Sequence, residues 1–382
     1  MTRTYLDHAS TTPPRPEVLA ALQQWMAMPA ADPGRLHAEG RIVRDALEHA
    51  RQQVAALVGS SAREVVFTSG GTEAINAAVW GATRRHPGDP VLFADVEHSA
   101  VREASTRLAP AEVIPVDVSA RIDAGALEAR LKAPGLPHPA LVHCQWGNHE
   151  VGTLQPVHEI VRLCRAAGVP VHVDAAAACG HVPLDLADLG ADLVSLSAHK
   201  IGGLPGAGAL IIRRGSRFEP LIVGGEQERA RRGGLEAIPA LVAFGAAAAA
   251  LGADGARLLH HEADRARTQI ATLSAAATAV EGVDVVGPHR PDQRLPSLLC
   301  LGVHGVEAEP VLIGLDRAGV AVHSGSACSS ESIEPSPVLE AMGVDASHSL
   351  RVSVGWSTTE DDVAAFGTAF AAVVAGLRAL RG

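Results

Sequence analysis

Lysine is nearly absent from this chain. Only two of its 32 basic residues are lysines, Lys132 and Lys200, and arginine supplies the rest of the positive charge. Because arginine is used wherever a cation is enough, we expect a lysine that remains to be needed as a primary amine. A primary amine can form a Schiff base with a carbonyl group, so a lysine beside a binding site is a candidate for covalent chemistry.

Other absences exclude whole classes of protein. The five cysteines are irregularly spaced and include no CxxC pair, so we expect neither disulfides nor a metal site. A net charge of −10 lacks the bulk electrostatics of a nucleic-acid binder. No apolar run approaches the length of a membrane helix, and the N-terminal MTRTYLDHAS has no signal-peptide core. We therefore expect a cytoplasmic protein that contacts neither nucleic acid nor a membrane directly.

Short apolar runs alternate with helical stretches over most of the chain. The predicted buried strands are 65–67, 91–93, 141–143, 171–173, 193–196 and 209–212. The predicted helices include 157–167 and 41–58, the latter with Val43, Leu47, Val54 and Leu57 on one face. This alternation predicts an α/β fold with a mainly parallel sheet. From about residue 254 onward, predicted strands at 298–303 and 351–354 lie between helices at 309–318 and 361–380, which indicates a smaller α+β domain.

A glycine turn, TSGGTE at 68–73, follows the first predicted strand. A glycine turn that leads into a helix leaves backbone N–H groups for an anion such as a phosphate. The segment matches neither the GxGxxG nor the P-loop pattern. By itself it is equally consistent with a plain strand-to-helix connection that has Thr72 as its N-cap.

Two later strands end in residues that match the needs of one cofactor. Asp174 follows the strand at 171–173, where a carboxylate is costly to bury without a cationic partner, although it can also serve as a helix N-cap. Lys200 follows the strand at 193–196, beside Ser197 and His199. Successive strands are often neighbours, so we expect Asp174 and Lys200 to lie close together. With the glycine turn as a phosphate site, this pair predicts pyridoxal phosphate.

Three more residues are candidates for the chemistry. Cys328 lies in the small-residue run HSGSACSS at 323–330 and is the candidate nucleophile, because the other four cysteines lie in or beside apolar stretches. Arg351, at a predicted strand start, can clamp a substrate carboxylate, or else form a surface ion pair. His98 lies just past the strand at 91–93, where a histidine taken singly is more often solvated than catalytic.

At these residues the sequence resembles the cysteine desulfurases, of the fold-type I class of pyridoxal-phosphate enzymes. It is most similar to the branch that serves iron–sulfur cluster assembly and nitrogenase maturation. The matching motifs, in order, are YLDHASTTP at 5–13, FTSGGTEAIN at 67–76, EHSAV at 97–101, HVDA at 172–175, SAHKIGG at 197–203, SGSACSS at 324–330, EPSPVLEAMG at 334–343 and LRVSVG at 350–355. The resemblance implies a homodimer. It also implies a large cofactor-binding domain at 15–253 with a mainly parallel seven-stranded sheet, and a small α+β domain made of 1–14 and 254–382.

The resemblance also implies a role for each matching residue. The implied roles are phosphate binding by Gly71, Thr72, Ser197 and His199, stacking on the pyridine ring and proton transfer by His98, pairing with the ring nitrogen by Asp174, the Schiff base by Lys200, binding of the substrate carboxylate by Arg351, and sulfur acceptance by Cys328. Such an enzyme converts L-cysteine to L-alanine and passes the sulfur, as a persulfide on Cys328, to an acceptor protein. The implied acceptor is an iron–sulfur scaffold, a tRNA-thiolating enzyme or a DNA phosphorothioation enzyme.

Three positions depart from the pattern of this family. His149 stands where the family has an Asn that contacts both cofactor and substrate, so we expect His149 to contact both. Ala177 stands where the family has a Gln near the phenolic oxygen of the cofactor, and an imidazole at His149 would supply the donor that Ala177 lacks. Leu235 stands where the partner subunit lends a Thr to the phosphate.

Two alternatives stay open at this point. One is a related lyase, acting on selenocysteine or cysteine sulfinate, or an aminotransferase, which needs no loop cysteine and yields a keto acid. The other is a scaffold that kept the fold but lost activity. In that case the departures at His149, Ala177 and Leu235 are changes that followed the loss of activity. Cofactor absorbance that depends on Lys200 distinguishes the enzymes from the scaffold.

Overall fold

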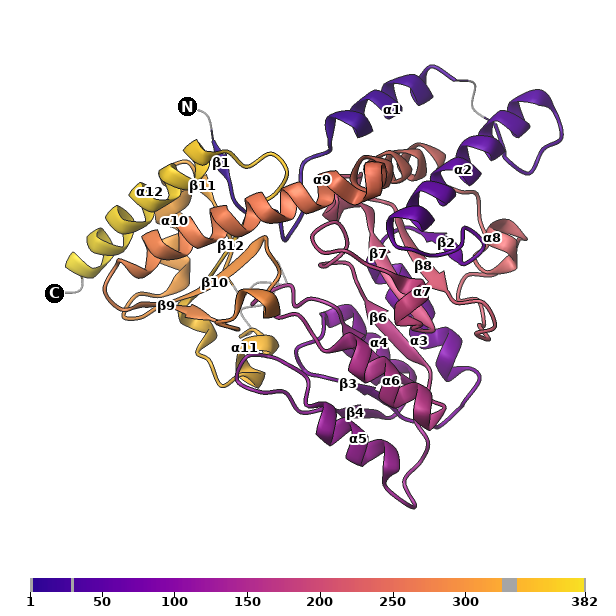
Figure 1. Cartoon of the computed structure of the whole chain (residues 1–382), viewed down its shortest axis with the longest axis horizontal. Coiled ribbons are helices and arrows are strands. Elements are labelled where there is room, and N and C mark those ends of the chain that lie inside the picture. Colours follow the sequence, from indigo (N-terminus) through magenta and orange to yellow (C-terminus); the bar gives the residue numbers. More distant parts are fainter. Residues whose placement is uncertain (1–2, 29–30, 325–334, 381–382) are drawn as a thin grey trace.

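The computed structural model describes residues 3–28, 31–324 and 335–380 (Figure 1). Its main sheet has seven strands in the order β2-β8-β7-β6-β5-β3-β4. The strands are β2 (Val65–Thr68), β3 (Val91–Phe93), β4 (Ala111–Val113), β5 (Leu141–Gln145), β6 (Val171–Asp174), β7 (Leu193–Ser197) and β8 (Gly208–Ile212). Strand β8 runs antiparallel to both of its neighbours, β2 and β7, and the other four strand pairs of the sheet are parallel. The predicted α/β fold with a mainly parallel seven-stranded sheet is therefore confirmed.

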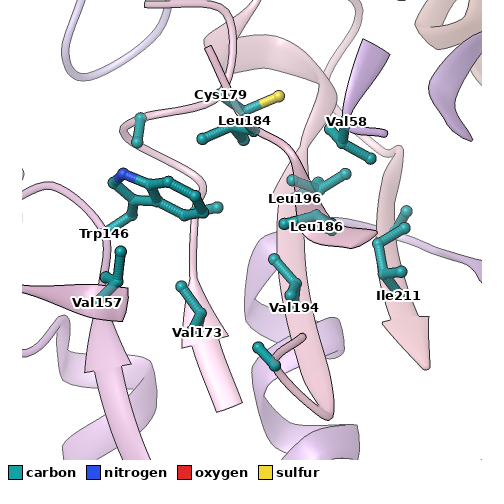
Figure 2. Close-up of a cluster of buried hydrophobic side chains, with 14 of the residues drawn as sticks. Val58, Trp146, Val157, Val173, Cys179, Leu184, Leu186, Val194, Leu196 and Ile211 are labelled. Carbon is teal, nitrogen blue, oxygen red and sulfur yellow. The ribbon is translucent and has the colours of Figure 1, made fainter. Parts of the chain in front are cut away.

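Six of the seven strands form because their apolar runs are buried on both faces of the sheet. All positions of β2, β3, β5, β6, β7 and β8 are buried. Figure 2 shows Val173, Val194 and Ile211 of three adjacent strands packed in one cluster with Trp146 and Leu186. This packing fixes the strand ends, from which the candidate site is built.

Helices pack around this sheet. They are α1 (Pro16–Met26), α2 (Ala38–Leu57), α3 (Gly71–Thr83), α4 (Ser99–Leu108), α5 (Ala124–Lys132), α6 (Val157–Ala167), α7 (Leu186–Leu189) and α8 (Gln227–Ala230), with a 3₁₀ turn at Ala198–Lys200. Val43, Leu47, Val54 and Leu57 of α2 are all buried, which confirms the predicted apolar face. The predicted helix at 157–167 coincides with α6.

A second, antiparallel sheet has the order β12-β10-β9 and its own hydrophobic cluster, which includes Phe366 and Phe370. The elements of this part are β9 (Val283–Val286), β10 (Leu298–Val303), β12 (Ser349–Ser353), α10 (Ala308–Arg317), α11 (Pro337–Ala341), α12 (Glu360–Ala379), and 3₁₀ turns at Pro291–Gln293 and Ala346–His348. The N-terminal β1 (Thr4–Tyr5) pairs with β11 (Val320–Ala321) beside them. The chain start thus lies with the C-terminal elements.

The long helix α9 (Ile238–Thr278) runs from the seven-stranded sheet to the three-stranded one (Figure 1). It packs against α1 and α2 near its start and against β9, β10 and α12 near its end. Its helical geometry is interrupted at Ala253–Ala256, where Asp254 and Ala256 have φ values of 50° and 61°. This break falls at the predicted boundary between residues 253 and 254, and the domain boundaries themselves stay a prediction.

Two helices correct the expectation that no segment is long and apolar enough to cross a membrane. By length and composition, α9 and α12 both meet that criterion. The core helices of proteins without membrane spans meet it as well, so the finding is weak evidence for a span. Phe244 and Leu251 of α9 and Phe366 and Phe370 of α12 are buried in the two hydrophobic clusters.

Candidate active site

One cavity of about 300 Å³ lies beyond the carboxyl ends of the parallel strands, where open α/β sheets bind their ligands. Every predicted site residue that the structure describes lines it. These residues are Gly71, Thr72, His98, His149, Asp174, Ser197, His199, Lys200 and Arg351. Cys328 lies outside the described residues. The cavity therefore collects side chains from five strand ends and from β12.

Lys200 is the last residue of the 3₁₀ turn that directly follows β7. Its ammonium group donates hydrogen bonds to the backbone oxygens of Ala9 and of Ser10, the latter at 2.8 Å. The N-terminal segment thus reaches across the cavity to the lysine, a contact that the sequence analysis missed because its only signal was the motif at 5–13. These bonds hold the amine at the cavity, where Ala9 and Ser10 also form part of the wall.

Asp174 is the last residue of β6 and is only 8% exposed. The Ser195 hydroxyl donates to its Oδ1 at 2.7 Å, and the Ala176 N–H donates to the same oxygen at 3.1 Å. Ser195 is its register partner on β7, which confirms that Asp174 and Lys200 follow neighbouring strands. A carboxylate held in this way can balance a cationic ring nitrogen. Sequence reasoning missed Ser195, whose only signal was its place two residues before Ser197.

His98 is the N-cap of α4, and its Nδ1 accepts a hydrogen bond from the Ala100 N–H at 3.1 Å. Burial lowers the pKa of His98 to about 4, and the neighbouring His149 and Lys200 act in the same direction, while Asp174 opposes them. His98 is therefore neutral near pH 7. Its ring centroid lies 5.1 Å from that of His149, with the ring planes at 60°.

Glu97, which the sequence analysis did not single out, is buried just behind this wall. Its Oε1 accepts a hydrogen bond from the Gln145 N–H at 2.6 Å. Burial, and then the charge of Asp174, raise the pKa of Glu97 to about 8. The Glu97 carboxyl group is therefore mostly protonated at neutral pH.

The anion end of the cavity lies at the start of α3. Gly70 is the N-cap of this helix, so the alternative with Thr72 as N-cap is wrong. A Cβ on Gly71 would lie 3.5 Å from Cβ of Ser197, so a side chain there would fill the space between helix and strand end. Backbone N–H groups at a helix N-terminus, the Ser197 hydroxyl and the His199 imidazole form a donor set that suits a phosphate. Together with Lys200 and Asp174, these residues fit pyridoxal phosphate.

Arg351 lies in the middle of β12 rather than at its start, and it is buried. Its Nη2 pairs with Oδ1 of Asp7 at 2.9 Å, and its Nη1 donates to the carbonyl oxygen of His149 at 3.0 Å. Within the described part of the chain, its buried Nε has no hydrogen-bond partner. A guanidinium that lines the cavity and keeps a buried donor is placed to bind a carboxylate.

The three departures from the family pattern fall at different places. His149 and Ala177 line the same cavity as Lys200. Leu235 does not belong to that wall but is 63% exposed on the surface, beside a small separate pocket. The imidazole at His149 and the small side chain at Ala177 thus shape one site together, whereas Leu235 lies on the surface, away from the cavity of its own chain.

Comparisons with known proteins agree with this geometry. The family model described as aminotransferase class-V matches residues 4–366. The chain belongs to this family. Class-V enzymes depend on pyridoxal 5'-phosphate, which confirms the cofactor predicted from Lys200 and Asp174.

Relatives within the class-V family share most of the length of this chain. A protein of Cereibacter sphaeroides named cysteine desulfurase is 39% identical and covers 100% of this chain and 98% of its own length. The structure of a NifS-like protein from Rickettsia africae is 28% identical, with a TM-score of 0.87 over 97% of this chain and 99% of its own. The structure of SspA in complex with cysteine is 27% identical, with a TM-score of 0.78 over 92% of this chain and 98% of its own. The class-V fold and its fold-type I architecture are thereby confirmed for this chain.

Proposed function

We propose that this chain is a cysteine desulfurase that converts L-cysteine to L-alanine. The observation that carries the proposal is the single cavity in which the Lys200 amine, the Asp174 carboxylate and the Arg351 guanidinium meet. An enzyme that acts on an amino acid with pyridoxal phosphate needs these three groups for the cofactor aldehyde, the ring nitrogen and the substrate carboxylate. The relative named cysteine desulfurase and the SspA structure with bound cysteine support cysteine as the substrate.

The chain's own residues divide the first steps among them. Pyridoxal phosphate, when bound, supplies an electron sink for the substrate carbon that loses its proton. The Lys200 amine, held at the end of β7, takes the proton from the substrate Cα and returns it. The Asp174 carboxylate, fixed by Ser195, stabilises positive charge on the ring nitrogen. Arg351 binds and orients the substrate carboxylate.

Sulfur transfer to Cys328 completes the proposed reaction. The Cys328 thiolate attacks the substrate sulfur, so a sulfur–sulfur bond forms while the bond between sulfur and Cβ breaks. The electron pair of the broken bond stays on Cβ, which gains a proton and becomes the methyl group of alanine. Of the two thiol protons that enter, one goes to that methyl group and one stays on the persulfide. The step is balanced without an outside oxidant or reductant.

The finer parts of the proposal concern assembly and partners. We infer a homodimer and a sulfur-acceptor protein, which is an iron–sulfur scaffold or a thiolation or phosphorothioation enzyme. Large apolar side chains that are exposed in the single chain, among them Leu36, Val223, Met26 and Leu235, are available for such contacts. The four described cysteines are buried and not paired in disulfides, as in a protein that works in the reducing cytoplasm. We also propose that the chain divides into a large domain at 15–253 and a small domain made of 1–14 and 254–382.

Product analysis tests the proposal. The purified, cofactor-loaded protein should form alanine and sulfide in equal amounts from L-cysteine and a reductant. Cys328→Ser should abolish both products and keep the cofactor absorbance, whereas Cys164→Ala, at a buried position on α6, should keep both. Sulfide release at the wild-type rate from Cys328→Ser would remove the acceptor role. A keto acid in place of alanine would instead identify an aminotransferase.

A further inference from the structure

The loop after β5 carries two ionisable residues side by side, His149 and Glu150. Nε2 of His149 lies 3.5 Å from Oε1 of Glu150, and their side chains are 12% and 4% exposed. A carboxylate this deeply buried needs a cationic partner or its own proton. Burial alone would raise the pKa of Glu150, but the bond to His149, and after it Ser336 and Arg351, bring the pKa below its usual value. The lowered pKa means that Glu150 favours its charged form, with the His149 ring as its nearest partner at this oxygen.

The surroundings hold this pair in place. The Glu150 N–H donates to Oδ1 of Asn148 at 2.9 Å, and Arg351 donates to the carbonyl oxygen of His149. The hydroxyl of Ser336 bonds to Oε2 of Glu150 and also caps α11. Both carboxylate oxygens therefore have partners, and the imidazole of His149 is fixed at the cavity wall.

His98 has a different environment, although its ring lies only 5.1 Å from that of His149. Its Nδ1 accepts a backbone hydrogen bond, and a protonated ring would lose this acceptor. Burial and then the neighbouring His149 lower the pKa of His98 to about 4. Two imidazoles this close do not both carry a proton at neutral pH, and Glu150 favours the proton on His149.

Other ionisable groups of the described part of the chain share the cavity with His149. Those that line the cavity with it are His98, Asp174, His199, Lys200, His323 and Arg351. The cations among them oppose a charged imidazole, but Arg351 is paired with Asp7 at 2.9 Å. Glu97, whose pKa is raised to about 8, contributes little charge at neutral pH. Oε1 of Glu150 lies 3.5 Å from Nε2 of His149, close enough for the carboxylate charge to favour a protonated ring.

We propose that His149 is the imidazole that donates a proton in this cavity, that Glu150 is the positioning residue that keeps His149 protonated, and that His98 works as a neutral ring. The inference rests on the proposed function. The carbon that loses sulfur must gain a proton when alanine forms, and His149 supplies it. The thiol proton that the reaction sets free restores the imidazolium, so the cycle balances.

Histidine titration in the cofactor-free protein tests the first half of this inference. In nitrogen-15 NMR spectra, with signals assigned through His149→Asn and His98→Asn, we expect His149 to stay protonated at a pH where His98 is neutral. Glu150→Gln removes the negative charge and should move the His149 titration down by at least one pH unit, while Glu150→Asp should keep most of it. An unmoved titration in Glu150→Gln, or a His149 that loses its proton together with His98, would overturn the inference.

The pH profile of alanine formation tests the second half. Loss of the His149 proton should lower kcat at alkaline pH, which gives the pH profile a falling alkaline limb. Glu150→Gln should shift this limb to lower pH with little change in KM. His149→Asn should remove the limb and lower kcat by about 10²-fold or more. Ser336→Ala keeps the charge of Glu150 but removes the hydroxyl that donates to its Oε2. The alkaline limb of the pH profile of this variant should therefore stay where it is in the wild type. His304→Asn disrupts an exposed imidazole–carboxylate pair and serves as the matched control.

The outcomes separate this inference from the proposed function. If Ser336→Ala shifts the limb as far as Glu150→Gln does, Glu150 acts only as an anchor for α11 and the inference fails. If the wild-type protein forms no alanine from L-cysteine, the proposed function fails. The NMR titration of the cofactor-free protein still decides in that case which imidazole holds the proton.

Discussion

The hydroxyl of Ser195 donates a 2.7 Å hydrogen bond to Oδ1 of Asp174, across the neighbouring strands β7 and β6. Both residues are buried, and Ser195 is fully so. Hydrogen bonds to a buried carboxylate stabilise its charged form and fix its orientation. The sheet register that pairs Ser195 with Asp174 therefore also prepares the carboxylate for a cationic ring nitrogen.

Ser195→Ala should weaken cofactor binding. A hydrogen bond to a charged group contributes about 1.5–3 kcal/mol, so we expect the Kd for pyridoxal phosphate to rise about tenfold or more. Cofactor titration followed by absorbance measures the change. Ser216→Ala removes another serine–aspartate bond, the one to Asp192, away from the cavity and should leave the Kd unchanged. Equal affinity in Ser195→Ala and wild type would show that Asp174 does not depend on Ser195.

The sequence predicted six of the seven strands of the main sheet, the edge strand β2 among them, because each of the six is a short apolar run whose residues are all buried. The edge strand β4 was missed, because its residues Ala111–Val113 are not buried and show no apolar pattern. The paired strands β1 and β11 were missed because two residues carry no periodicity. The local sequence pattern thus predicts strands that bury a continuous apolar surface. It does not predict strands that form only because they pair with a neighbouring strand.

The candidate site shows the same division. Asp174 and Lys200 could be placed together because each follows a predicted strand, and parallel strands end at the same edge. The bond from Lys200 to Ser10 and the pair of Arg351 with Asp7 join residues far apart in the sequence. Contacts of this kind depend on how the N-terminal segment crosses the folded chain, and no local spacing encodes them.

Lys200→Ala should abolish alanine formation and the visible absorbance of the cofactor-loaded protein. No other side chain of the described cavity offers a primary amine, because the second lysine, Lys132, lies on the surface in an ion pair with Glu128. Spectra after cofactor addition and dialysis measure the loss. Lys132→Ala is the matched control and should keep both the absorbance and the activity. Absorbance that persists in Lys200→Ala at the wild-type position would refute the covalent role of Lys200.

Glu97 should make the protein less stable as the pH rises. Its pKa is raised to about 8 by burial and by Asp174, so the folded state holds a proton that the unfolded state has already released. Between the usual glutamate pKa and about 8, the folded state binds more protons, and the free energy of unfolding falls with increasing pH.

Urea unfolding at pH 5 to 9 measures this effect as the difference between wild type and Glu97→Gln. The difference cancels the contributions of histidines such as the buried His172 and the half-buried His181, whose lowered pKa values give the opposite slope at acidic pH. We expect the wild type to lose stability relative to Glu97→Gln as the pH rises. A difference that stays constant across this range would show that Glu97 does not titrate there.

Glu228→Gln should destabilise the fold by about 3–5 kcal/mol, because it leaves a buried guanidinium without its counter-charge. Glu228 accepts hydrogen bonds from both terminal nitrogens of Arg51, at 2.5 and 2.8 Å, and from the Phe67 N–H of β2 at 2.7 Å. The Arg51 guanidinium also lies 4.7 Å from the centroid of the Phe67 ring. Since β2 leads directly into the glycine turn, this buried pair supports the phosphate end of the site.

Urea denaturation of the two proteins at pH 7 checks this prediction. Glutamine keeps the size of the side chain and tolerates the backbone at this position, where φ is 49°, as well as glutamate does. The variant therefore isolates the charge. Asp264→Asn breaks an exposed ion pair with Arg267 and should change the free energy of unfolding by less than about 1 kcal/mol. A loss from Glu228→Gln no larger than that of the control would mean that Arg51 keeps enough partners without the carboxylate charge, and that packing against Phe67 and the backbone bonds hold β2 in place.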